Sequence, residues 1–403
     1  MRLTVLNDLI SVFIISGVLR PRAETRPREG CDEMDGKNLK KIVELRHELH
    51  AHPELAMHEG WTKRCLMDFI GANTTLAVVD CGGWFYASRY REGTPAVAFR
   101  ADMDALPIPE TISLPHASEN PGVSHKCGHD GHSAALCGLA LELEAMECPR
   151  SVYLIFQQAE ETGQGGAAAA ALLPERHVSE VYAFHNRSGY PEGSVILRNG
   201  LCQCASRGLT VRMTGRRSHA SEPEKGNNPA FALAALVAEV RALLARPHRG
   251  MVLATVVNLS VGRRDFGISP GEGEVSMTLR ADDEAEMEAF EAEVRGRAIA
   301  LATAEGLEVG FDVSDPFPAT VSDAGCVAKI EAAAGRLGRP VVWMEAAWRA
   351  SEDFGHYTKR CPGAIFYVGN GADWPALHTP EYDFNDRILE AAVDVFREVY
   401  RGA

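Results

Sequence analysis

Short apolar runs alternate with helix-like segments in the first half of the chain. Residues 95–100, 151–156 and 178–184 have the composition of buried strands, and residues 38–50 and 133–146 place apolar residues at helical spacing. Strands that alternate with helices predict an α/β layer on a mixed, largely parallel sheet flanked by helices. In such sheets, the polar residues that follow the strands collect along one edge, where ligands bind.

The pattern changes near residue 205. The predicted elements there are strand 208–213, helix 229–244, strands 252–261 and 272–280, helix 283–302 and strand 307–313. The order βαββαβ is typical of a ferredoxin-like α+β module. The first pattern then resumes, so we expect a discontinuous main domain, residues 35–204 and 317–403, interrupted by an inserted domain, residues 205–316.

Composition narrows the class of protein. The chain has 403 residues, of which 46% are hydrophobic and 24% charged, as expected for a folded protein of two domains. A formal net charge of -14 argues against nucleic-acid or anionic-membrane partners. No apolar run reaches the roughly 18 residues of a spanning helix. Ten cysteines in so long a chain favour free thiols in a reducing compartment, which predicts a cytoplasmic protein.

The N-terminal segment bears a faint likeness to a signal peptide. Residues 3–19 are mostly apolar, but Asn7 and Asp8 interrupt them and no small-residue cleavage site follows. We therefore expect residues 1–34 to be an extension that is not part of the fold. A start assigned too early, with Met34 as the true first residue, is the alternative.

Polar residues follow each of the predicted buried strands: Asp102, Asp104, Glu160, Glu161 and His185. Adjacent side chains on an extended backbone point in opposite directions. One carboxylate of the Glu160–Glu161 pair could therefore bind a metal while the other faces the water that the metal activates. A solvated acidic turn is the competing interpretation of this pair. For Asp102, a capping or hydrogen-bonded loop residue is at least as compatible with the sequence.

Residues 125–132, HKCGHDGH, gather three histidines, one cysteine and one aspartate just before a predicted helix. The thiolate of Cys127 and the imidazole of His129 together suit a borderline-soft divalent ion such as zinc. A surface loop that caps a helix is the simpler alternative. His185 and His378 would each, taken alone, be ordinary histidines. The metal interpretation therefore depends on all of these residues together.

From about Leu39 to the C-terminus the sequence resembles the amidohydrolase branch of the aminoacylase and glutamate carboxypeptidase superfamily. That branch includes hippurate hydrolase, N-acyl-L-amino acid amidohydrolases and auxin-conjugate amidohydrolases. The motifs that carry the resemblance are RHELHAHPEL at 46–55, RADMDALP at 100–107, NPGVSHKCGHDGH at 120–132, AEE at 159–161, GRRSHASEPEKGNNP at 215–229, SEDF at 351–354 and HTPEYDF at 378–384.

The resemblance implies a catalytic domain that binds two divalent metal ions. Zinc, manganese, nickel and cobalt are all chemically admissible at such a site. The ligands that it implies are Cys127, His129, Glu161, His185 and His378. It also implies that Glu160 is the general base, and that His219, on an inserted lid and dimerisation domain, stabilises the oxyanion in the partner subunit of a homodimer.

Two further residues are candidates for supporting roles. Asp104 is a candidate for the group that hydrogen-bonds a ligand histidine and fixes its tautomer. Arg280, at the end of a predicted strand, is a weaker candidate for binding a substrate carboxylate, and a plain surface arginine fits the sequence equally well.

The function that the resemblance implies is hydrolysis of the amide bond of N-acyl amino acids, hippurate-like or N-acetylated, by a metal-activated water with a Glu general base. Three alternatives stay open: a dipeptidase or aminopeptidase-like metallopeptidase of the same superfamily, a catalytically silent binding or regulatory relative, and a thiol-dependent redox protein. The Cys-x-His pair favours hydrolysis of N-acyl amino acids over the peptidase alternative, because the peptidases of the superfamily usually show His-x-Asp. The presence of Glu160 disfavours a silent relative.

Overall fold

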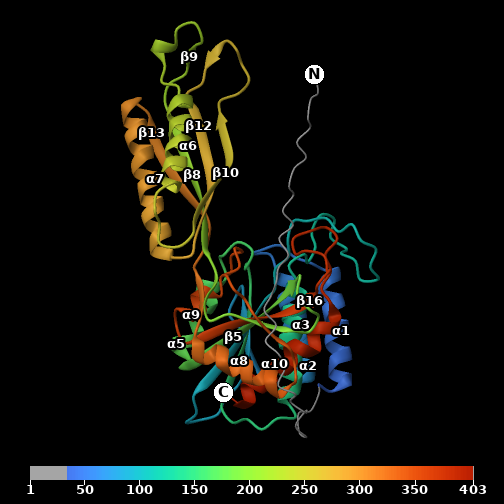
Figure 1. Cartoon of the computed structure of the whole chain (residues 1–403). Helices are drawn as coiled ribbons and strands as arrows, with labels where there is room; N and C mark the ends of the chain where they lie inside the picture. The colour runs from blue at the N-terminus through green and yellow to red at the C-terminus, as the bar shows by residue number, and fades with distance from the viewer. Residues whose placement is uncertain (1–33, 403) are drawn as a thin grey trace, which may run out of the picture.

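The computed structural model describes residues 34–402, which form two lobes, each built on its own sheet (Figure 1). The larger lobe contains an eight-stranded sheet of order β1-β2-β4-β3-β5-β16-β6-β15. Its strands are β1 (Ala77–Asp80), β2 (Phe85–Arg89), β3 (Ala96–Asp102), β4 (Ser151–Gln157), β5 (Val178–Ser188), β6 (Val195–Leu197), β15 (Val341–Trp343) and β16 (Gly363–Gly371). The central neighbours β4, β3, β5 and β16 run parallel, which confirms the predicted largely parallel sheet.

Helices cover both faces of this sheet. On one face lie the longer helices α1 (Gly36–Ala51), α2 (Gly60–Asn73), α3 (His129–Leu143), α8 (Ala324–Arg336) and α10 (Leu389–Gly402). On the other lie the short helices α4 (Gly166–Ala169), α5 (Leu172–Glu175) and α9 (Gly355–Thr358). Every residue of α3 except Glu142 is buried, because α3 packs between the sheet and the helices α1 and α10. This central helix begins at the candidate metal-binding motif.

The smaller lobe is a four-stranded antiparallel sheet of order β10-β12-β8-β13. Its elements, in chain order, are β8 (Ala205–Thr214), α6 (Ala230–Leu244), β10 (Val252–Val261), β12 (Glu272–Ala281), α7 (Glu284–Ala304) and β13 (Glu308–Phe317). Alternate residues of β12 are buried against α6 and α7, which form a separate core with the sheet. The order βαββαβ confirms the predicted ferredoxin-like insert.

A small two-stranded sheet lies where the chain passes between the lobes. Strand β7 (Gly200–Gln203) leads into β8, strand β14 (Thr320–Ser322) follows β13, and the two pair antiparallel. A second short pair, β9 (Ser218–His219) and β11 (Ile268–Ser269), lies at the far end of the insert (Figure 1). The 3-10 turns are η1 (Pro223–Lys225) and η2 (Asp386–Ile388). We propose that the β7–β14 crossing is the boundary between the two predicted domains.

The predicted extension, residues 1–34, lies outside the described residues except for Met34, whose side chain is buried in the main core. Helix α3 starts at His129, four residues before the predicted start at Ser133, because Gly128 makes the turn into the helix. Strands β1 and β2 are absent from the sequence predictions. Strand β1 is only four residues long and is mostly exposed, so it has no buried face.

The helices that the structure describes include none long and apolar enough to cross a membrane. The cysteines among the described residues all have free thiols: Cys65, Cys81, Cys127, Cys137, Cys148, Cys202, Cys204, Cys326 and Cys361.

Replacement of Gly138 by Ala tests the close packing of α3. A Cβ atom at Gly138 would lie 2.6 Å from Cγ2 of Val393 on α10 and 3.1 Å from Cδ1 of Ile42 on α1. We expect Gly138→Ala to lower the free energy of unfolding by about 1–3 kcal/mol, the usual effect of overpacking. The matched control is Gly296→Ala in α7, where a Cβ meets nothing within 4 Å, so stability should rise by about 0.5–1 kcal/mol. Equal denaturant midpoints for the two variants would contradict this packing argument.

Candidate metal centre

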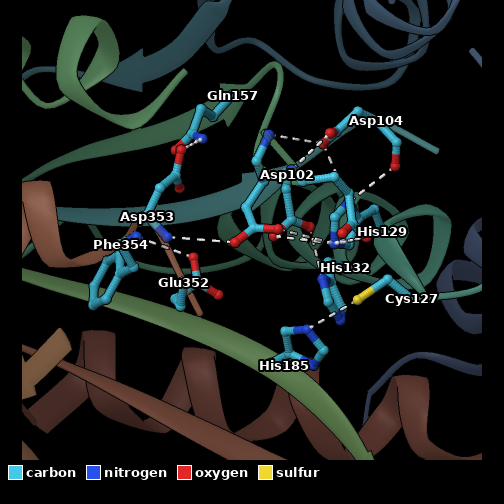
Figure 2. A network of polar contacts seen from close by, with 12 residues as sticks. Asp102, Asp104, Cys127, His129, His132, Gln157, His185, Glu352, Asp353 and Phe354 are labelled. Carbon is cyan, nitrogen blue, oxygen red and sulfur yellow. Dashed lines mark hydrogen bonds and ion pairs between the residues drawn. The ribbon is translucent and has the colours of Figure 1, made fainter. Parts of the chain in front are cut away.

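Most of the residues singled out from the sequence converge at the carboxyl end of the parallel strands, among them Asp102, Asp104, Cys127, His129 and His185 (Figure 2). Asp102 is the last residue of β3, and the Glu160–Glu161 pair follows β4. His185 lies inside β5, which continues to Ser188, so the expectation that His185 ends its strand is wrong. Cys127 and His129 enter from the start of α3.

Among the groups of side chains that could hold a metal ion, two share the sulfur atom of Cys127 and together contain five side chains. The ligand atoms of Cys127, His129 and His185 lie within 4.8 Å of one another, and so do those of Cys127, Glu161 and His378. The Sγ atom of Cys127 is 3.5 Å from Nε2 of His185, and Oε1 of Glu161 is 3.6 Å from Nε2 of His378. The structure thus brings together all five residues that the resemblance implied as ligands.

The residues present fit divalent metal ions. Nε2 of His129 and Oε1 of Glu161 are buried and lack a hydrogen-bond partner among the described residues. Leaving such atoms unsatisfied costs free energy unless a ligand binds them. They lie 3.7 Å apart, too far for a hydrogen bond but close enough to be bridged by an ion. A set of thiolate, imidazole and carboxylate donors suits a borderline-soft transition metal.

The backbone is constrained at Gly128, between two of the candidate ligands, and at His378. Gly128, between Cys127 and His129, has a φ of 103°, and a Cβ there would lie 2.4 Å from Oδ1 of Asn186. Glycine alone tolerates both conditions. His378 also has a positive φ, 63°, and its backbone N–H donates to the carbonyl of Lys126 at 2.7 Å. This hydrogen bond fixes the loop of His378 beside Cys127.

Asp104 organises the turn that carries the two glutamates. Its Oδ1 accepts a hydrogen bond from the backbone N–H of Glu160 at 3.0 Å, and its Oδ2 accepts one from Glu161 at 2.9 Å. Its backbone carbonyl lies 2.9 Å from Nδ1 of His129, which leaves Nε2 of that ring facing the ligand group. Glu160 and Glu161 lie in a turn after Ala159, whose φ is 51°. The premise of an extended backbone at this pair is therefore wrong.

Burial and mutual repulsion perturb the acidic groups of the centre. Burial, reinforced by the carboxylates of Glu161 and Glu160, raises the pKa of the Cys127 thiol well above its usual value. Burial also raises the pKa of Glu161 to about 7. Burial opposes the charged form of His129, but Asp102 and Asp104 outweigh it and raise the pKa of that ring to about 10. Burial therefore favours the neutral thiol and the neutral carboxyl of Glu161, and a bound cation would stabilise their charged forms.

The pKa of His185 is shifted in the opposite direction to that of His129. Burial, with the neighbouring His132 and His129, holds the pKa of His185 well below its usual value. Its Nδ1 lies 2.7 Å from the carbonyl of Asn186. A neutral ring whose Nδ1–H is held by a carbonyl presents Nε2 as an electron-pair donor.

A buried arginine that was not predicted as a functional residue, Arg100, holds the acidic residues next to Glu160. The Arg100 guanidinium contacts Asp102 and Asp353, each at 2.7 Å, and Gln157 at 3.0 Å. The backbone N–H of Asp353 in turn donates to Oε1 of Glu160 at 3.3 Å. The sequence does contain a signal, a charged residue at the end of an apolar strand. If that strand is buried, the arginine is buried with it and needs acidic partners.

A second buried arginine links the two segments that carry ligands. Arg46 of α1 pairs with Asp130, next to His129, and with Asp383, on the loop of His378. His50, one helical turn later, lies 2.8 Å from Oδ2 of Asp130. This network joins α1, the start of α3 and the C-terminal loop.

Two predicted residues lie away from the cluster. His219, on β9 at the far end of the insert, is exposed, and its Nδ1 lies 2.6 Å from Oγ of Ser221 (Figure 1). Arg280 of β12 donates to the carbonyl of Arg349 at 2.8 Å and to Oγ of Ser351 at 2.7 Å. Neither residue joins the metal-binding groups of its own chain.

A family model described as peptidase family M20/M25/M40 matches residues 98–401. The chain belongs to this family. It is an amidohydrolase, an enzyme that acts on carbon–nitrogen bonds.

Similar curated proteins span almost the same length. An N-acetyldiaminopimelate deacetylase of Exiguobacterium sibiricum is 28% identical, with 90% of this chain and 99% of that protein aligned. A hippurate hydrolase of Campylobacter jejuni is 27% identical, with 89% and 95% aligned. Among solved structures, a putative aminohydrolase from methicillin-resistant Staphylococcus aureus is 26% identical and has a TM-score of 0.80, covering 90% of this chain and 97% of its own. The YXEP protein of Bacillus subtilis, described as a dinuclear metal-binding peptidase, shares the fold with a TM-score of 0.77 at 24% identity, over 91% of this chain and 98% of its own.

Glu110 offers a pH-dependent test of the network around Arg46. Its carboxylate contacts His50 at 3.0 Å and Lys126, and accepts the Ser118 N–H at 2.9 Å. Burial opposes ionisation, but these hydrogen bonds lower the pKa of Glu110 from 4.5 to about 2. A lowered folded-state pKa means stabilisation that is complete above pH 4.5 and is lost as the pH falls toward 2.

We therefore expect Glu110→Gln to lower stability at pH 7 by about 1 kcal/mol, because the neutral amide loses the charged hydrogen bonds to His50 and Lys126. Thermal melting between pH 7 and pH 3 should show the difference from wild type shrinking as the pH falls. Glu119→Gln, in the same loop but with a side chain 71% exposed, is the control and should change little. A difference that grows toward acid would contradict the assignment.

Proposed function

We propose that this protein hydrolyses the amide bond of N-acyl amino acids, using two divalent metal ions. The proposed ligands are Cys127, His129, Glu161, His185 and His378. The observation that carries the proposal is the pair of ligand groups that share Cys127. Relatives named hippurate hydrolase and N-acetylcysteine deacetylase, at 27% and 28% identity over nearly the full chain, support this class of substrate.

Two divalent ions at this centre would polarise the scissile carbonyl and lower the pKa of a water molecule. Zinc, manganese, nickel and cobalt all suit the mixed thiolate, imidazole and carboxylate donors. We propose that Asp104 keeps the His129 ring in the orientation and tautomer that such binding needs, as supported by its hydrogen bonds to that ring and to the glutamate turn.

Glu160 is the proposed general base. Its side chain is buried beside the ligand groups, with Oε2 3.7 Å from Nε2 of His129. The Asp353 N–H holds its other oxygen. In this role Glu160 takes the proton from the attacking water and delivers it to the leaving amine nitrogen.

His219 is proposed to act in the partner subunit of a homodimer. Its position at the far end of the insert supports action on another chain rather than on its own (Figure 1). The edge strand β10 exposes Val256, Val257 and Leu259, which offers an apolar surface for pairing through the insert. In the partner's site, the imidazole of His219 would donate a hydrogen bond to the oxyanion.

Glu160→Gln tests the chemistry. We expect turnover of N-acetyl and N-benzoyl amino acids to fall roughly a hundredfold or more, because the carboxamide cannot accept the proton. Metal content, measured by elemental analysis, should stay at the wild-type level. Cys127→Ala is the contrasting variant and should lose metal, since both ligand groups include this thiol. Near-wild-type turnover by Glu160→Gln would remove the proposed base, and no hydrolysis of any N-acyl amino acid by the two-metal wild type would remove the proposed function.

Mixing two inactive variants tests the role of His219. In a hybrid of His219→Ala and Glu160→Gln subunits, one of the two sites would combine an intact Glu160 with an intact His219 from the other chain. Random reassociation should therefore restore about a quarter of the wild-type activity. Mixtures no more active than the separate variants would show that His219 does not act across subunits.

A further inference from the structure

Arg187 lies two residues after His185 on β5, so both side chains project from the same face of the sheet. Its guanidinium is half-buried among aromatic rings, 4.6 Å from the centre of Trp348, 5.0 Å from Tyr190 and 5.7 Å from Tyr367. No carboxylate of the described residues lies within ion-pairing distance of it, and Nη1 of Arg187 donates a hydrogen bond to the sulfur of Met344 at 3.1 Å.

Other arginines that lie over rings have an acidic partner, except Arg176 over Tyr86, which is exposed to solvent whereas Arg187 is half-buried. Arg295 lies 4.7 Å from the ring centre of Phe311 and pairs with Glu291 at 2.7 Å. Arg387 lies over Trp374 and pairs with Glu192 at 2.6 Å. A partly desolvated guanidinium retains a strong preference for an anion, which the aromatic faces satisfy only in part.

A second unsatisfied group adjoins Arg187. Tyr367 of β16 is fully buried, and its hydroxyl has no hydrogen-bond partner among the described residues. The register of β16 on β5 places Tyr367 beside His185. The ring of Trp348 also adjoins both, with its centre 5.8 Å from that of His185 and 6.0 Å from that of Tyr367. The guanidinium and the hydroxyl are therefore neighbours of a proposed metal ligand.

We propose that Arg187 binds a carboxylate of the amino-acid half of the substrate, with the Tyr367 hydroxyl as a second donor. The inference deepens the proposed function and rests on it. Residues two apart on a strand are about 6.6–6.8 Å apart. In an N-acyl amino acid, only the amide nitrogen and Cα separate the scissile carbonyl carbon from the α-carboxylate. Arg187 lies on the same face of β5 as the proposed ligand His185, so one substrate could place its amide at the metal centre and its α-carboxylate toward Arg187.

Arg187 suits this role better than Arg280, the candidate from the sequence. The guanidinium of Arg280 already donates to Arg349 and Ser351 at the junction between the lobes. Its hydrogen bonds fix the loop that precedes Glu352 and Asp353, so Arg280 positions protein segments instead of facing a ligand.

Binding is measured by calorimetry on metal-loaded Glu160→Gln, in which turnover is blocked, with and without Arg187→Met. The probes are N-acetyl-L-alanine, with an α-carboxylate, N-acetyl-L-isoglutamine, with a side-chain carboxylate only, and N-acetyl-L-alaninamide, with neither. We expect Arg187→Met to weaken binding of a carboxylate probe by about 10- to 100-fold and to leave the amide probe unchanged. The probe that loses affinity identifies which carboxylate Arg187 binds.

Matched variants separate a lost contact from a damaged fold. Arg187→Lys keeps the charge without the planar fork and should give an intermediate loss. Tyr367→Phe removes only the hydroxyl and should weaken the same probe several-fold. Arg295→Met, which removes an acid-paired arginine from over a ring, should bind as the parent does. Equal losses for all three probes, or no loss for any, would overturn the role of Arg187.

Failure of this inference differs from failure of the proposed function. If wild type hydrolyses N-acyl amino acids and Arg187→Met binds every probe as the parent does, the reaction stands and the carboxylate site is wrong. If wild type hydrolyses none of them but Arg187→Met still loses affinity for a carboxylate probe, the carboxylate site stands and the proposed reaction is wrong.

Discussion

Cys127 places one sulfur atom within reach of two separate groups of side chains, and the surrounding elements are arranged to make this possible. The thiol must approach β5 closely, which only a glycine at position 128 allows, and helix α3 must begin at once so that His129 turns toward the same space. The backbone hydrogen bond from His378 to Lys126 then brings the C-terminal loop alongside. A shift of any of these elements would separate the two groups.

The same centre concentrates negative charge in a buried place, and two arginines with full burial limit the cost. Arg100 pairs with acids behind the glutamate turn, and Arg46 pairs with acids beside the two ligand loops. Both lie outside the ligand groups, so they neutralise the supporting carboxylates and leave the thiol and Glu161 for cations. Buried ions are tolerated when such networks are complete and become costly when one partner is removed. The fold and the proposed chemistry therefore depend on the same charges.

Local patterns in the sequence were enough to predict the parallel sheet and the ferredoxin-like insert, because both depend on periodicity within single elements. They were not enough for the networks that support the site. The ion pair of Arg100 with Asp353 joins residues 253 apart, and the contact of Arg46 with Asp383 joins residues 337 apart. The geometry of the Glu160–Glu161 turn also depends on a distant group, since Asp104 holds it. Tertiary contacts of this kind leave no periodic trace in the chain.

The place of β16 in the sheet has a consequence for the order of folding. This strand lies next to β5 at the centre of the large sheet, yet the ribosome makes it only after the whole insert. The insert draws on local pairing and has its own core, so it can form on the nascent chain while the larger sheet still lacks an inner strand. The loop of His378 emerges later still. The proposed ligand set is thereby complete only when synthesis is complete, and an unfinished chain exposes the edge of β5 to association with other chains.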